Sequence, residues 1–213
     1  QLRIMRALLR GQRGVIAAYP MGSGKTITAI AASECLKNQA RILGIKMNIY
    51  VIVPTSLIGN YKTEVDKTGY KWDPEDVIIT KTKFFRQIKT GIITSLRNYI
   101  VIYDEAHTLR TDYRCEFCSD LVMALKGSQE GTIAETSLQV ISTAWKVIGL
   151  TGTPIYNQPY DWVNLWALAT GKPPLTFFEY SMMHETGKGL QNVLSFYDIP
   201  RDHFPRREDI YHL

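Results

Sequence analysis

A glycine-rich hexapeptide after a short apolar run constrains the fold of this chain more than any other feature. The run covers residues 14–19 (GVIAAY), and residues 21–26 read MGSGKT. A β-branched run that ends in glycines and continues into a helical pattern predicts a strand, a loop and a helix. Glycines let backbone N–H groups approach phosphate oxygens, and the N-terminus of a helix favours negative charge. The hexapeptide therefore predicts a phosphate-binding loop.

The residue types in this loop suit a nucleotide. Lys25 is expected to reach the β- and γ-phosphates, and the Thr26 hydroxyl to hold Mg²⁺. The full pattern G-x-x-x-x-G-K-[ST] has a first glycine where this chain has Tyr19. Taken alone, the short form leaves open a chance glycine-rich turn between a strand and a helix. The backbone around the phosphates would come from Gly22, Ser23 and Gly24.

Length and composition set broad limits on this chain. Its 213 residues are enough for one large domain with a buried core. A formal net charge of +5 fits a polyanionic partner without requiring one. No apolar run approaches the roughly 18 residues of a membrane span, and no signal peptide is visible. Because the chain begins with Gln1 rather than Met, we expect a fragment of a longer protein.

The three cysteines favour no metal centre. Cys115 and Cys118 form a C-x-x-C pair, but the sequence holds no second pair to complete a four-ligand zinc site. We interpret them as two thiols in a reducing compartment, with a metal or redox role as the alternative. Cys35 lies in a helical pattern and is expected to be a small buried residue.

Continuous apolar runs alternate with helical patterns along most of the chain. Such runs are typical of parallel strands that are covered on both faces. The sequence therefore predicts an α/β fold, a doubly wound parallel sheet. The expected strands are residues 14–19, 49–53, 77–80, 99–103 and 146–150, and the expected helices are residues 1–10, 27–36, 57–65 and 160–170.

Two segments are less regular. Residues 110–145 show no clear period and contain an expected surface loop at 127–131. A Gly-Lys-Pro-Pro cluster marks a boundary near residue 171, after which 171–213 are expected to be a helical extension with an extended end from Phe204. Near the N-terminus, an arginine stripe is interpreted as a solvated helix face or, alternatively, a nucleic-acid contact. The stripe comprises Arg3, Arg6, Arg10 and Arg13.

An acidic motif follows the expected strand 99–103 directly. It reads Asp104-Glu105-Ala106-His107. An open α/β sheet places its ligands at the carboxyl ends of its strands. In a phosphate-cradle enzyme, Asp104 would hold Mg²⁺ through its water shell, and Glu105 would orient and activate the attacking water. The alternative is an acidic turn at the N-terminus of a helix.

Hydroxyl side chains follow three other strands. Thr151 and Thr153 flank a glycine after strand 146–150, where they could link a nucleotide site to a neighbouring surface. Thr55, with Ser56 beside it, follows strand 49–53, and Thr80 ends strand 77–80. Thr55 and Thr80 have two interpretations, a helix N-cap or a contact to a nucleic-acid phosphate.

Taken in order, these motifs resemble the first RecA-like lobe of superfamily 2 helicases and translocases. The likeness is greatest to the SWI/SNF-type branch of DNA-dependent ATPases, including related ATPases of large DNA viruses. In that branch the phosphate loop also lacks its first glycine, so Tyr19 fits. The wording TGTP differs from the SAT of RNA-processing DEAH helicases. The similar segments are Gln1, where the family keeps an adenine-recognising glutamine, and residues 18–26, 51–61, 104–107, 150–157 and 160–170.

The resemblance implies a P-loop NTPase lobe over residues 1–170 that binds ATP and Mg²⁺. Thr26 and Asp104 would hold the Mg²⁺. The residues implied in hydrolysis are Lys25, Asp104, Glu105 and His107. Those implied in ATP binding are Gln1, Gly22, Ser23, Gly24, Lys25 and Thr26. Those implied in nucleic-acid contact or coupling are Thr55, Ser56, Thr80, Thr151 and Thr153.

The function implied is ATP hydrolysis that depends on double-stranded DNA, in a helicase or translocase. A second RecA-like lobe with arginine fingers would follow residue 213, and 171–213 would lead toward it. The alternatives are an RNA helicase, a restriction-type translocase, or a scaffold lobe that responds to nucleotide without turnover. Tyr19 and Pro20 stand where chromatin remodellers often carry an acidic pair, so the enzyme class is better supported than remodelling. We expect an intracellular location without a membrane partner: the nucleus, or the virion and host cell if the protein is viral.

Overall fold

The chain forms a doubly wound α/β lobe around one parallel sheet. The computed structural model describes residues 2–109, 133–154 and 162–174. Five strands lie in the order β1-β5-β4-β2-β3, and every neighbouring pair is parallel. This confirms the fold class predicted from the sequence. The strands are β1 (Gly14–Ala18), β2 (Asn48–Val53), β3 (Val77–Thr80), β4 (Tyr99–Tyr103) and β5 (Lys146–Thr151).

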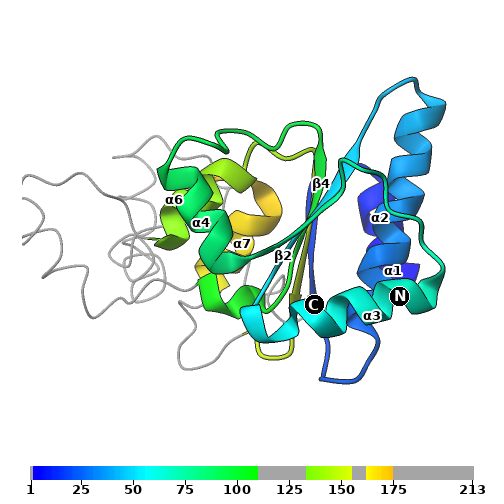
Figure 1. Cartoon of the computed structure of the whole chain (residues 1–213), viewed down its shortest axis with the longest axis horizontal. Helices are drawn as coiled ribbons and strands as arrows, with labels where there is room; N and C mark the ends of the chain where they lie inside the picture. The colour runs from blue at the N-terminus through cyan, green and yellow to red at the C-terminus, as the bar shows by residue number, and fades with distance from the viewer. Residues whose placement is uncertain (1, 110–132, 155–161, 175–213) are drawn as a thin grey trace, which may run out of the picture.

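Helices cover both faces of the sheet, as Figure 1 shows. One face packs against α1 (Leu2–Leu9), α2 (Lys25–Ile42) and α3 (Ile58–Thr68). The other packs against α4 (Lys81–Lys89), α6 (Ile133–Ile141) and α7 (Trp162–Thr170). Two 3₁₀ turns, η1 (Thr55–Leu57) and η2 (Ala106–Leu109), lie at strand ends. No helix in the described ranges combines the length and the apolar character that a bilayer crossing requires.

The interior strand β2, which lies between β4 and β3, shows why an unbroken apolar run suits this sheet. All six of its residues are buried. Because side chains alternate across a strand, Ile49, Val51 and Val53 enter the core beneath α1–α3. Tyr50 and Ile52 enter the opposite core. Each face therefore receives apolar side chains, and no polar alternation is needed.

The helices depart from the sequence prediction in three places. α2 runs past residue 36 to Ile42, because Asn38, Gln39 and Arg41 are exposed there while Ala40 is buried. Gly44, with φ 74°, follows the end of the helix. α4 was not predicted, since a mostly polar segment buries one large side chain, Phe84. α6 lies within the stretch expected to be irregular, and Ile141 fixes it in the core. The expected loop at 127–131 and the tail from residue 175 lie outside the described residues.

Two expectations for single side chains are wrong. Arg3, Arg6 and Arg10 are exposed, but Arg13 is not part of a solvated face. Its guanidinium donates to Ile141 O at 2.7 Å and to the carbonyls at the end of α7, and burial lowers the pKa of Arg13. Cys35 is half-buried rather than fully buried. Cys115 and Cys118 lie outside the described residues.

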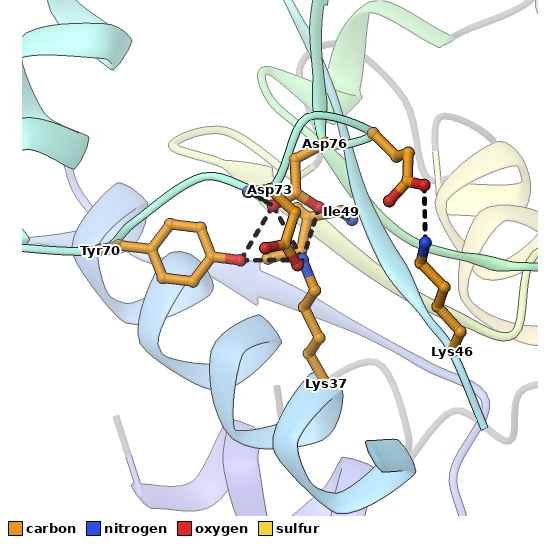
Figure 2. Close-up of polar contacts among 7 residues, drawn as sticks. Lys37, Lys46, Ile49, Tyr70, Asp73 and Asp76 are labelled. Atoms are coloured by element: carbon orange, nitrogen blue, oxygen red, sulfur yellow. Dashed lines mark hydrogen bonds and ion pairs between the residues drawn. The ribbon is translucent and has the colours of Figure 1, made fainter. Parts of the chain in front are cut away.

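A buried carboxylate ties β2 to the chain that precedes β3, at the amino edge of the sheet. The Asp76 side chain has no exposed surface and accepts from Lys37 Nζ at 2.8 Å and from Ile49 N at 2.7 Å. Tyr70 OH and Asp73 N also donate to it, as Figure 2 shows. Burial alone would lower the pKa of Lys37, but its hydrogen bonds raise it above the usual range. The cluster therefore compensates the cost of burying two charges.

Replacing Lys37 with Met should lower the free energy of unfolding by about 3 kcal/mol, because Asp76 would stay buried without its cation. The matched control is Lys46→Met, which breaks the Lys46–Glu75 pair at 2.6 Å whose side chains are 71% and 48% exposed. The control should cost less than about 1 kcal/mol. Urea unfolding of both variants measures the difference. Equal losses of unfolding free energy in the two variants would contradict the stabilising role of the buried Lys37–Asp76 pair.

Candidate functional site

Strand order brings three predicted motifs to one edge of the sheet. β5 pairs with β1 on one side and with β4 on the other. Ala18 lies opposite Thr151, and Tyr103 lies opposite Gly149. Because all strands are parallel, the glycine loop, the acidic motif and the Thr-Gly-Thr-Pro turn leave the sheet at the same edge. The structure thus assembles segments that are far apart in the sequence.

The loop between β1 and α2 has the backbone of an anion site. Gly22 and Gly24 adopt left-handed φ values of 74° and 78°. Gly24 is the N-cap of α2 and makes no side-chain capping bond. The first turn of α2 also carries no acidic residue. Because no side chain caps this turn, the first N–H groups of α2 are available to an anion.

Lys25 folds back over this loop. Its Nζ donates to Tyr19 O at 2.8 Å and to Pro20 O at 2.9 Å. Thr26 is half-buried in the same first turn of α2, and Ser23 is exposed. The loop is also joined to the neighbouring strand, because Tyr19 N donates to Thr151 O at 3.1 Å.

Asp104 is buried at the end of β4, with 7% of the residue exposed. Its N–H donates to Ile52 O at 2.9 Å, and its carboxylate accepts from Glu105 N at 2.8 Å. Burial raises the pKa of Asp104, and the charge of Glu105 adds to that shift. The hydrogen bond from Glu105 N and the charges of Lys81 and Lys25 oppose it. The carboxylate therefore lies where a cation would be favoured.

The side chains of the acidic motif reach the turn after β5. Glu105 Oε2 lies 3.2 Å from His107 Nδ1, and the same nitrogen lies 3.1 Å from Thr151 Oγ1. Thr151 is fully buried, and its hydroxyl oxygen also accepts from Thr153 N at 3.1 Å. A continuous polar path thus joins Glu105 to Thr153 across the sheet edge.

Lys81 belongs to the same edge, although sequence reasoning missed it. Its Nζ donates to Glu105 O at 2.8 Å and lies 4.8 Å from the centre of the Tyr103 ring. Burial lowers the pKa of Lys81 to about 8, while the charges of Asp104 and Glu105 oppose that shift. No sequence pattern marks this lysine, because its importance depends on β3 lying two strands from β4.

The remaining predicted residues have mixed outcomes. Thr55 and Ser56 are exposed in η1. Thr55 is not an N-cap, because Pro54 is the N-cap residue of η1 and Leu57 is that of α3. Thr80 does cap α4, because its Oγ1 accepts from Lys83 N at 3.2 Å. These three hydroxyl residues lie at the ends of β2 and β3, which β5 and β4 separate from the strand that carries the glycine loop. Gln1 lies outside the described residues.

Replacing Thr151 with Val should lower the free energy of unfolding by about 1 kcal/mol, because Thr153 N and His107 Nδ1 would lose the buried hydroxyl that they contact. Thr153→Val is the matched control, since Thr153 uses its backbone in this bond and its side chain is exposed. Urea unfolding compares the two variants. A control that loses as much as Thr151→Val would contradict the role of the buried hydroxyl.

Residues 1–74 match the SNF2-related domain family. The chain is 31% identical over 168 residues to the uncharacterized ATP-dependent helicase MG018 of Mycoplasma genitalium, covering 76% of this chain and 15% of that protein. It is 26% identical over 178 residues to the human DNA annealing helicase and endonuclease ZRANB3, covering 74% and 14%. The putative ATP-dependent RNA helicase R563 of Acanthamoeba polyphaga mimivirus is 25% identical over 70% of this chain and 28% of its own length.

Among solved structures, the Pyrococcus furiosus Hef helicase domain has a similar fold. The TM-score is 0.51 at 17% identity, covering 79% of this chain and 36% of that one. At this identity the likeness concerns the fold alone. The chain spans 14% to 28% of the length of the three relatives named above.

Proposed function

Because this chain is a superfamily 2 helicase lobe of the SWI/SNF type, we propose that it is the ATP-binding half of a motor that depends on double-stranded DNA. The observation that carries this proposal is the meeting of three motifs at one sheet edge. The glycine loop, the acidic motif and the Thr-Gly-Thr-Pro turn are joined there through Tyr19, His107 and Thr151. Several relatives are named ATP-dependent helicases, which supports ATP as the nucleotide.

The residues of the edge fit ATP and Mg²⁺. The uncapped first turn of α2 offers N–H groups to phosphate, and Lys25 would exchange the carbonyls of Tyr19 and Pro20 for phosphate oxygens. The Thr26 hydroxyl would offer Mg²⁺ an oxygen ligand, and the Asp104 carboxylate would hold the ion through its water shell. The bound ion would neutralise charge on the phosphates. Gly22, Ser23 and Gly24 would surround them, and Gln1 would contact the adenine.

Glu105 is the proposed base that orients the attacking water. His107 lies beside its carboxylate at 3.2 Å and beside Thr151 at 3.1 Å. A change at Glu105 during hydrolysis would therefore reach the turn that carries Thr153. Thr55, Ser56, Thr80 and Thr153 are the proposed contacts or coupling residues on the nucleic-acid side.

A second RecA-like lobe is proposed to follow this chain in the full-length protein. The short share of each relative that the chain spans supports this proposal. An arginine finger from that lobe would stabilise charge in the transition state, a contribution worth about 10³–10⁵ in rate. The isolated lobe is therefore expected to hydrolyse ATP very slowly.

Replacing Lys25 with Ala in the full-length protein should lower nucleic-acid-stimulated ATP hydrolysis by about 10²–10³-fold, because the phosphates would lose a positioned donor. Lys46→Ala is the control, since Lys46 is an exposed lysine at the opposite edge. Steady-state phosphate release measures both. An active Lys25→Ala variant would overturn the proposed site.

An RNA helicase is the second candidate, because R563 and another mimivirus relative, L538, are named putative ATP-dependent RNA helicases. Stimulation of ATP hydrolysis by duplex DNA, single-stranded DNA and RNA distinguishes the two functions. We expect the highest kcat with duplex DNA, without sequence preference, since backbone contacts carry no sequence information. Stronger stimulation by RNA would favour the alternative.

With about six phosphate contacts, the affinity of the protein for duplex DNA should fall on the order of 10³-fold between 50 and 200 mM salt.

A further inference from the structure

The backbone of Glu105 is held in an uncommon conformation by several hydrogen bonds. Its φ of 47° is the one positive value among non-glycine residues in the described part of the chain. Its carbonyl oxygen accepts from Lys81 Nζ at 2.8 Å, from Thr108 Oγ1 at 2.8 Å and from Thr108 N at 3.1 Å. Its amide donates to Asp104 Oδ1 at 2.8 Å. Of these partners, Lys81 alone comes from outside residues 104–108.

Contacts of the backbone and of the side chain fix the position of Lys81. It is the first residue of α4 and directly follows β3, 24 residues before Glu105. The preceding residue, Thr80, caps α4 through Lys83 N. The Lys81 side chain turns inward, where its Nζ contacts Thr108 Oγ1 as well as Glu105 O and lies over the Tyr103 ring. The β3–α4 junction is therefore linked to Glu105 by one long side chain.

We propose that Lys81 is a positioning residue for ATP hydrolysis, which holds the Glu105 backbone so that its carboxylate faces the reacting phosphate. This inference rests on the proposed function. The β3–α4 junction carries Thr80, a proposed nucleic-acid contact. Movement of this junction on nucleic-acid binding would therefore reach Glu105 through Lys81, and the lysine gives the motor a route from substrate contact to hydrolysis.

The inward direction of the side chain argues against a nucleic-acid contact by Lys81 itself. Its ammonium is directed at Glu105 O and Thr108 Oγ1, and its pKa is lowered by burial. The charges of Asp104 and Glu105 oppose that shift, so the lysine is held by the acidic motif.

The test compares Lys81→Met with Lys81→Arg in the full-length protein. Lys81→Met should lower kcat for nucleic-acid-stimulated ATP hydrolysis by about 10–100-fold, since small displacements of a reacting group have effects of this size. The KM for ATP and the affinity for duplex DNA should stay within about twofold. Lys81→Arg keeps a cation and donors, and should recover part of kcat. Lys83→Met, the same change at an exposed position of α4, should have wild-type kinetics.

A second measurement does not depend on turnover. Amide hydrogen exchange of residues 105–108 should be faster in Lys81→Met than in Lys83→Met, because the Glu105 carbonyl would lose a donor. Thr108→Val removes the other side-chain donor to the Glu105 carbonyl and one contact of Lys81, but it keeps the lysine and should give a smaller loss of kcat. If Lys81→Met does not fold, the kcat of Thr108→Val tests whether hydrogen bonds to the Glu105 carbonyl are needed for hydrolysis.

The outcomes separate the two proposals. An unchanged kcat in Lys81→Met, or a loss confined to KM, overturns the positioning role while Lys25→Ala still tests the ATP site. Equal losses in Lys81→Met and Lys83→Met also overturn it, since they would reflect surface charge. A wild-type protein without ATP hydrolysis would overturn both proposals.

Discussion

The insertion of β5 between β1 and β4 is the constraint on which the rest of this structure depends. β5 comes last in the chain among the described strands, yet its register sets Thr151 against Ala18 and Gly149 against Tyr103. β5 leaves no room for a side chain at Gly149, where an added Cβ would lie 2.6 Å from the Ile16 side chain of β1. Because the strands are parallel, this pairing brings the glycine loop and the acidic motif to either side of one buried threonine. The polar path from Glu105 to Thr153 exists only with this strand order.

The electrostatics of the sheet edge follow from the same arrangement. Asp104 and Glu105 are adjacent carboxylates at the end of a buried strand, and burial disfavours the charge of Asp104. Lys25 and Lys81 oppose that effect from α2 and α4, on opposite faces of the sheet. In the proposed mechanism, Lys25 turns to the phosphates and Lys81 stays with the Glu105 backbone. In this proposal, Lys25 binds the substrate and Lys81 positions Glu105, although both lysines lie near the same carboxylates.

Sequence reasoning succeeded where local chemistry decides and failed where distant contacts decide. Apolar runs predicted all five strands within a residue or two, because strands buried on both faces need apolar side chains throughout. α4 escaped prediction because one buried Phe84 secures a mostly polar segment. Arg13 was misassigned because its acceptors lie more than a hundred residues away, on α6 and α7. Thr55 has a capping residue's type and position, but η1 begins there instead.

The sequence by itself determined the glycine loop, the acidic motif and the parallel α/β class, since glycine conformations, helix starts and buried strands are local properties of residue type. It also contained the motifs by which the family is recognised. Only the tertiary structure decided which of these motifs meet, because strand order is a matter of non-local pairing. It alone linked Lys81 to Glu105, since a contact between neighbouring sheet elements leaves no periodic mark in the chain. The sequence thus identified the motifs of the candidate site, and the strand order determined which of them lie together.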